Sequence, residues 1–193
     1  MVPLGWEAAV DAVQATTSQL LLGVRIQGAF FVWAEHLPGS DWKVPFVGAL
    51  AYLLCAYLAN RTLEWRKSHT MFVTIASSGV LRSIALAHNA AMIVFSAAIS
   101  VLTAYDLVIY IRTRGLYDFA CPPVGSASAD PPLMSGRLIY WTYLFYISKF
   151  YELTDSVLLA LKNKRLIGLH IWHHMSMLPA VCVPPSLAFP PGY

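Results

Sequence analysis

The stretch that decides the fold runs from Ile84 to Ile111 and reads IALAHNAAMIVFSAAISVLTAYDLVIYI. It is almost entirely apolar, and as a helix it is long enough to cross the hydrocarbon core of a bilayer, which takes about 20 residues. It ends at the basic run Arg112-Thr-Arg114, where the chain would meet the membrane surface. The stretch therefore predicts a transmembrane helix.

Three further segments are apolar and long enough to be considered as spans. We expect them at roughly Val44–Ala59, Leu138–Leu161 and Leu166–Val183. The first should end at a basic turn that begins at Asn60-Arg61, and the last should be disturbed near its end by Pro184-Pro185. The predicted fold class is all-α, a polytopic transmembrane helix bundle.

The composition of the whole chain supports this class. Of its 193 residues, 58% are hydrophobic and 12% are charged, about half the charged fraction of a soluble domain. The 6 Trp and 10 Tyr suit a protein with many side chains at lipid interfaces. A net charge of +3 without a long Lys/Arg cluster argues against nucleic-acid binding, so the lipid bilayer is the expected partner. The 3 cysteines are far apart and predict neither a disulfide framework nor a zinc site.

The chain is expected to form one membrane domain over residues 1–193, incomplete at its C-terminus, with an N-terminal interfacial region at 1–43. Within that region, Leu20–Trp33 is apolar but carries Arg25 and Gln27. An apolar segment interrupted in this way predicts a short interfacial helix and not a span.

The sequence predicts different conformations for two of the segments that connect the spans. Met71–Val80 is a candidate reentrant or interfacial piece, and Cys121–Gly136, rich in small residues and proline, should be irregular. Basic residues concentrate after the first span and in the short turn Lys162–Arg165, so both turns are placed in the cytosol. The start of the fourth span then lies at the cytosolic face.

Three charged residues interrupt the third predicted span. They are Lys149, Glu152 and Asp155, and at about 100° per residue they fall on one side of a helix. A charge inside a span is costly, so such residues usually face the bundle interior and mark a site. Either they form a neutralised cluster, with Lys149 and Glu152 paired, or they position a polar substrate group or orient a histidine.

Three histidines follow the basic turn at positions His170, His173 and His174. On a helix they fall within an arc of about 100°, so their imidazoles share one face. Two chemistries suit such a cluster. The neutral ring nitrogens can ligate iron or zinc, or one ring can act as a nucleophile or general base held by its neighbours.

The order and spacing of these two groups resemble a known family. The run Lys149-Phe-Tyr-Glu152-Leu-Thr-Asp155-Ser156, a basic turn and then Leu169-His170-Ile-Trp-His173-His174 closely resemble the ELO pattern K-x-x-E-x-x-D-[ST] with L-H-x-x-H-H. The H-x-x-H-H motif alone is not specific, because membrane desaturases share it. The match becomes specific because the acidic pattern precedes the motif at the distance seen in the ELO family. His88-Asn89 also resembles a pair often found in the second span, and the resemblance covers roughly Ala59–Leu178.

This resemblance implies an elongase of very-long-chain fatty acids in the endoplasmic reticulum membrane, built as a seven-helix bundle around an acyl tunnel. It implies that an acyl-CoA and malonyl-CoA condense to a 3-ketoacyl-CoA two carbons longer, with loss of carbon dioxide. No metal or further cofactor is implied. Other enzymes of the elongation cycle, or further copies of the chain, are the expected protein partners.

The resemblance also implies roles for the two groups. His173, the family's central histidine, would be the acyl acceptor or base, and His170 and His174 would hold or polarise it. The charged residues of the third span, Lys149, Glu152 and Asp155, would orient the histidines or meet the thioester end.

The chain departs from the family pattern at two points. Ser156 replaces the commoner Thr but keeps a hydroxyl, and the later motif H-x-x-M-Y-x-Y-Y is absent. Two alternatives therefore stay open. One is a di-iron membrane desaturase or hydroxylase, which needs more histidine boxes than the 6 histidines here supply. The other is a catalytically inactive structural relative.

Overall fold

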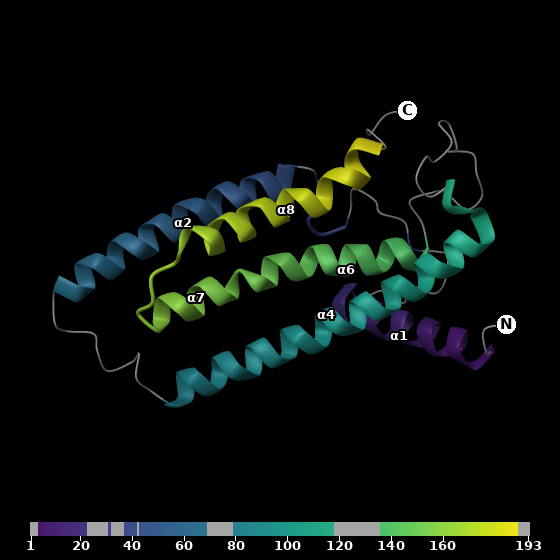
Figure 1. The fold of residues 1–193 in the computed structure, drawn as a ribbon, viewed down its shortest axis with the longest axis horizontal. Coiled ribbons are helices and arrows are strands. Elements are labelled where there is room, and N and C mark those ends of the chain that lie inside the picture. The colour runs from purple at the N-terminus through teal and green to yellow at the C-terminus, as the bar shows by residue number, and fades with distance from the viewer. Residues whose placement is uncertain are drawn as a thin grey trace. The chain divides into compact units, whose positions relative to one another are not determined.

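The computed structural model describes residues 4–22, 31, 37–41, 43–68, 79–117 and 136–188, and within these ranges it describes the side chains except at 4, 21–22, 66–68 and 182–188. Over this part of the chain the protein is all-α, which confirms the predicted fold class. The helices labelled in Figure 1 are α1 (Leu4–Leu22), α2 (Lys43–Ser68), α4 (Gly79–Arg114), α6 (Arg137–Glu152), α7 (Thr154–Leu161) and α8 (Gly168–Ala188).

Two of these helices are long and apolar enough to cross a membrane, α2 over Lys43–Trp65 and α4 over Gly79–Arg114. Both carry large apolar side chains that contact little protein. Leu50 of α2 is 67% exposed and Ile93 of α4 is 69% exposed, as expected for side chains that face lipid. The first two predicted spans are therefore confirmed.

Helix α2 is longer than the sequence predicted. We expected a turn at Asn60-Arg61, but the helix continues to Ser68. The segment 60–68 contains no Gly or Pro, and the Thr62 hydroxyl donates to the Ala59 carbonyl at 3.0 Å, a bond that a helix accommodates. The predicted turn was therefore wrong, because basic residues by themselves do not end a helix.

The third predicted span is divided at Leu153 into α6 and α7, which have 16 and 8 residues. The Leu153 amide donates to the Phe150 carbonyl at 3.2 Å, and the Ser156 amide donates to the Leu153 carbonyl at 3.1 Å. Both bonds reach back three residues and tighten the backbone relative to an α-helix. No Gly or Pro marks this point, so the apolar pattern wrongly predicted one continuous helix over Leu138–Leu161.

Helix α8 follows a turn in which Asn163 adopts a left-handed backbone, with φ of 53°. Asn tolerates this conformation better than most residues. The helix then continues to Ala188, beyond the predicted end of the fourth span. Proline fixes φ near its helical value and removes one backbone hydrogen bond, and membrane helices tolerate that loss, so Pro184-Pro185 does not end the helix.

Helix α1 was not predicted at all. Its buried face mixes apolar and polar side chains, namely Val10, Gln14, Ala15 and Ser18. A face of this composition has no clear hydrophobic periodicity, so no local pattern indicated the helix. The expected interfacial helix at Leu20–Trp33, the piece at Met71–Val80 and the loop at Cys121–Gly136 lie largely outside the described residues.

The chain divides into two compact units, Met1–Leu37 with Ala97–Phe145, and Pro38–Ser96 with Tyr146–Tyr193. In the first unit a charge network joins three helices. Asp106 of α4 accepts hydrogen bonds from Arg137 and from the Trp141 indole, each at 2.8 Å, and Arg137 also donates to Asp11 of α1 at 2.9 Å. Both carboxylate oxygens of the buried Asp106 therefore have hydrogen-bond donors, as a buried charge requires.

In the second unit α2 runs alongside α8 and also contacts α7 (Figure 1). A small buried core forms from Tyr52, Ala56 and Leu166, and Ile171 and Met175 of α8 pack against it. The predicted site residues all lie on the helices of this unit or close to their ends.

Candidate functional site

The three histidines of α8 lie together as a contiguous group. The ring centroids of His170 and His174 are 4.5 Å apart, and those of His173 and His174 are 5.4 Å apart. Both pairs meet edge to face, with interplanar angles of 73° and 72°. A spacing of three and four residues places side chains on the same side of a helix, which is why the sequence motif yields this group.

His170 is held by a chain of hydroxyl groups. Its Nε2 lies 2.8 Å from the Ser156 hydroxyl oxygen, and that oxygen lies 3.0 Å from the Tyr52 hydroxyl. Ser156 and the Tyr52 hydroxyl come from α7 and α2, so the chain joins three helices at one ring. A ring whose Nε2 is already hydrogen-bonded has a fixed orientation, and that nitrogen is not free to attack a substrate.

His174 is the most buried of the three rings, with 6% of its residue surface exposed. The Tyr52 ring packs edge to face against it, with centroids 5.6 Å apart. Tyr52 therefore contacts the site twice, through its ring and through its hydroxyl. Sequence reasoning missed this residue, because a tyrosine inside an apolar span resembles the interfacial tyrosines that many membrane proteins carry.

His173 differs from its two neighbours. It is exposed, and its ring contacts His174. Within the described ranges, neither ring nitrogen of His173 has a hydrogen-bond partner. His173 is also the exposed one of the three imidazoles, so its nitrogens are open to an incoming group.

The charged residues of the third predicted span divide into two sets at the break between α6 and α7. The Lys149 ammonium lies 2.6 Å from a Glu152 carboxylate oxygen, and both side chains are largely buried. Partnered charges of this kind are the usual form in which Lys and Glu are buried. The structure therefore brings Lys149 and Glu152 to each other as an ion pair within the last turn of α6.

Asp155, beyond the break, contacts a histidine outside the motif. Its carboxylate oxygen lies 2.8 Å from His88 Nε2, and His88 Nδ1 lies 3.3 Å from the Tyr151 hydroxyl. A carboxylate on one ring nitrogen fixes the orientation of an imidazole. The two-sided contact makes His88 part of the site, where the sequence offered only a resemblance for the His88-Asn89 pair.

A polar cavity of about 230 Å³ lies next to this carboxylate. Four of its lining residues are polar or charged, namely Asn89, Asp155, Lys162 and His170. Apolar side chains of α4 and α7 complete the wall, namely Ala85, Leu158 and Leu159. Asp155 of the acidic motif and His170 of the histidine motif thus line the same cavity. The sequence showed only that one motif follows the other along the chain.

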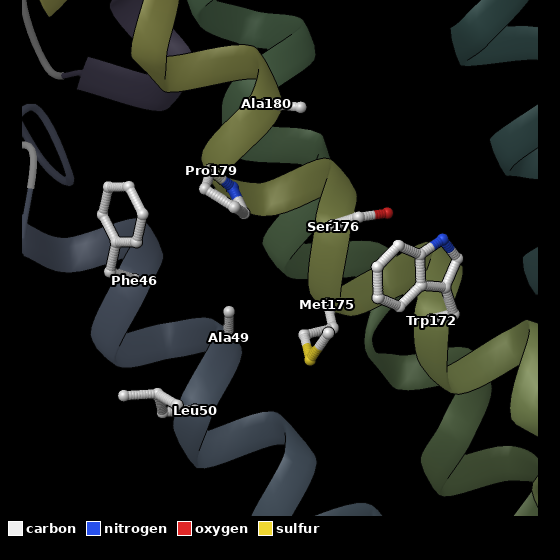
Figure 2. Close-up of a pocket in the computed structure, with 8 residues that line it drawn as sticks. All are labelled: Phe46, Ala49, Leu50, Trp172, Met175, Ser176, Pro179 and Ala180. Atoms are coloured by element: carbon white, nitrogen blue, oxygen red, sulfur yellow. The ribbon is translucent and has the colours of Figure 1, made fainter.

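A second, apolar cavity of about 580 Å³ lies between α2 and α8. Figure 2 shows its lining side chains, Phe46, Ala49 and Leu50 from α2 and Trp172, Met175, Ser176, Pro179 and Ala180 from α8. Trp172 and Ser176 flank His173 along α8, one residue before it and three after it. The exposed histidine therefore sits on the same helical segment that forms one wall of this apolar space.

Metal binding was the other chemistry that the three histidines suggested. Among the residues whose placement is described, no group of three or more His, Cys, Asp or Glu side chains is arranged to hold a metal ion. Edge-to-face stacking of the rings differs from the convergence of ring nitrogens on one point that a metal site requires. The prediction that the protein works without metal stays a prediction.

The chain is similar to known proteins over most of its length. The model of the ELO family, described as GNS1/SUR4, matches residues 37–186. Fatty acid elongase sre1 of Dictyostelium discoideum is 30% identical over 152 residues, which cover 78% of this chain and 51% of the relative. Very long chain fatty acid elongase 2 of Mus musculus is 26% identical over 157 residues, which cover 79% of this chain and 44% of the relative.

Very long chain fatty acid elongase 6 of Drosophila melanogaster is 32% identical over 98 residues, covering 51% of this chain and 29% of the relative. The matches to the Dictyostelium proteins with the longest alignments cover about half the length of those relatives. No solved structure matches the chain.

Proposed function

Because the chain belongs to the ELO (GNS1/SUR4) family of fatty acid elongases, we propose that it is a very-long-chain 3-oxoacyl-CoA synthase of the endoplasmic reticulum membrane. Its substrates would be an acyl-CoA and malonyl-CoA, and its reaction would need no metal or further cofactor. The whole protein's activity is part of the proposal, since the chain spans about half the length of its curated relatives.

One observation carries the assignment of roles among the histidines. His170 is occupied by the Ser156 hydroxyl at 2.8 Å, and His174 is buried, whereas the nitrogens of His173 are unoccupied in the described structure. A nucleophile needs a free lone pair and neighbours that hold it in place. This combination supports His173 as the acyl acceptor and the other two rings as its supports.

The first step that we propose is acyl transfer to the protein. A nitrogen of His173 attacks the acyl-CoA carbonyl, the carbon–sulfur bond breaks, and the CoA thiolate leaves and takes up a proton. The product is an acyl-imidazole. Splitting the reaction in this way replaces one difficult step by two easier ones.

The second step forms the new carbon–carbon bond. The bond between C2 and the free carboxylate of malonyl-CoA breaks, carbon dioxide leaves, and its electron pair remains on C2 as an enolate. C2 then attacks the acyl carbonyl, the carbon–nitrogen bond breaks, and the freed nitrogen takes up a proton from solvent, which returns the imidazole. The sum is acyl-CoA, malonyl-CoA and one proton in, with 3-ketoacyl-CoA, CoA and carbon dioxide out.

The apolar cavity between α2 and α8 supports an acyl substrate. Nearly all of its lining is hydrocarbon, and its polar side-chain groups are the Ser176 hydroxyl and the Trp172 indole N–H, so a methylene chain displaces few hydrogen bonds on entering. Each buried methylene group contributes about 0.8 kcal/mol of transfer free energy, so a long chain is held far more tightly than a short one.

The proposal is tested on the product of the complete gene in yeast microsomes that lack their own elongases. With acyl-CoA substrates of graded length and carboxyl-labelled malonyl-CoA, we expect labelled carbon dioxide and a 3-ketoacyl-CoA in equal amounts. Desaturated or hydroxylated product formed with NADH and oxygen would instead support the desaturase alternative. An expressed protein that forms neither product, beside an active elongase control, would be the inactive relative and would contradict the proposal.

A further inference from the structure

Two side chains on the wall of the polar cavity are hydrogen-bond donors for which the described residues supply no partner. Within the described part of the chain, neither the Asn89 side-chain amide nor the Lys162 ammonium takes part in a hydrogen bond or ion pair. Asn89 is exposed among the described residues and lies in the apolar helix α4, and a polar residue within a membrane span usually marks a functional position. Lys162 lies at the C-terminus of α7, where the helix dipole attracts a positive charge, and this explains a lysine at that position. The dipole does not explain why an amide side chain from α4 lines the same cavity. The pair therefore points to a ligand.

The charge and size of the cavity narrow the chemistry of that ligand. Lys162 is balanced by Asp155 on the cavity wall, and Asp155 is in turn paired with His88 at 2.8 Å. A near-neutral lining does not select a multiply charged phosphate. The volume of about 230 Å³ is less than half the roughly 580 Å³ of the apolar cavity, so this cavity suits a short thioester end better than a long acyl chain.

We propose that this cavity is the subsite for the malonyl thioester, in which Asn89 and Lys162 donate hydrogen bonds to the thioester oxygen. The inference rests on the condensation proposed above and adds the residues that stabilise its second step. When carbon dioxide leaves, the electron pair of the broken bond spreads from C2 to this oxygen, which becomes an enolate oxyanion.

Transition-state logic decides which oxygen these donors should bind. A cation bound to the malonyl carboxylate would stabilise the ground state, because the carboxylate loses its charge as carbon dioxide leaves. Such a contact would slow the reaction. Donors placed at the thioester oxygen are worth more as negative charge develops there, so they lower the barrier. His170, which also lines the cavity, places it next to the histidine group that would carry the acyl chain.

The test separates the two half-reactions in the product of the complete gene. The variants are Asn89→Leu and Lys162→Met, with Lys164→Met as the matched control, because Lys164 lies in the same turn but does not line the cavity. Loss of one oxyanion donor lowers rate by about 10²–10³-fold. We therefore expect carbon dioxide release from malonyl-CoA at saturating acyl-CoA to fall by that factor in Asn89→Leu and Lys162→Met. CoA release from acyl-CoA alone, and the KM for acyl-CoA, should change less than about twofold.

Two further variants show whether a loss of rate reflects the lost donor or a poorly folded protein. Lys162→Arg retains the cation and should recover most of the rate, whereas Asn89→Asp keeps the shape, adds a negative charge and should not. Unchanged carbon dioxide release in Asn89→Leu and Lys162→Met would overturn the subsite, as would an equal loss in both half-reactions. A wild-type protein that releases no carbon dioxide from malonyl-CoA would overturn the condensation itself, a separate outcome that the variants do not affect.

Discussion

Asn60 of α2 binds the backbone of Leu166 at two points. Its side-chain amide donates to the Leu166 carbonyl at 3.0 Å, and its side-chain oxygen accepts from the Leu166 amide at 2.9 Å. Leu166 shortly precedes α8, and its side chain is buried in the core with Tyr52 and Ala56. The contact therefore fixes the start of the histidine helix against α2.

Replacement of Asn60 should loosen this contact. Asn60→Ala leaves the Leu166 amide and carbonyl without their partners, and we expect a loss of about 1–3 kcal/mol in stability. Thr62→Ala is the matched control, since its hydroxyl makes only a bond within its own helix. Thermal inactivation of the protein in detergent measures the difference. Equal midpoints for Asn60→Ala and Thr62→Ala would contradict a positioning role for Asn60.

The same residue begins the sequon Asn60-Arg-Thr62, which makes it a test of topology. If this end of α2 lies in the cytosol, as its basic residues predict, Asn60 should carry no glycan in microsomes. As a positive control, Ser126→Asn creates an acceptor site between the second and third predicted spans, a connection that lies in the lumen if both basic turns are cytosolic. A glycan on Asn60, removed by endoglycosidase, would reverse the proposed orientation of the chain in the membrane.

The hydroxyl chain to His170 predicts coupled effects of two substitutions. Tyr52→Phe and Ser156→Ala each break the chain, and a hydrogen bond contributes about 0.5–1.5 kcal/mol, so each should lower kcat by roughly two- to tenfold. Because both act on one ring, the double variant should lose less than the product of the two effects. Ser156→Thr should keep the rate. Strictly multiplicative losses would show that the two residues do not act through the same chain.

Metal content distinguishes the elongase from its desaturase alternative. If the histidines act as organic groups, the purified product of the complete gene should hold no stoichiometric iron or zinc by elemental mass spectrometry, and chelators should leave its activity unchanged. About two irons for each chain, with activity lost on chelation, would move the assignment to the desaturase class.

The sequence predicted the features that depend on local pattern. The span at α4 followed from an uninterrupted apolar run, and the common face of the three histidines followed from helical spacing. It did not predict the break at Leu153, where no Gly or Pro marks the chain, or helix α1, whose buried face is partly polar. Such features are set by contacts between distant segments.

The site shows the same division. The acidic motif predicted that Lys149, Glu152 and Asp155 lie near the chemistry, but the pattern could not tell that Asp155 pairs with His88 while Lys149 and Glu152 pair with each other. Tyr52 had no local signal, because its role depends on Ser156, which lies 104 residues further along the chain.

The central claim is that His173 carries the acyl group, and mass spectrometry tests it directly. The product of the complete gene is incubated with acyl-CoA alone, quenched and digested, and the peptide that contains His173 is analysed. We predict an added acyl mass on His173, with CoA released in an equal amount, and no adduct or condensation in correctly inserted His173→Ala. A peptide without an adduct, together with near-normal turnover of His173→Ala, would contradict the assignment.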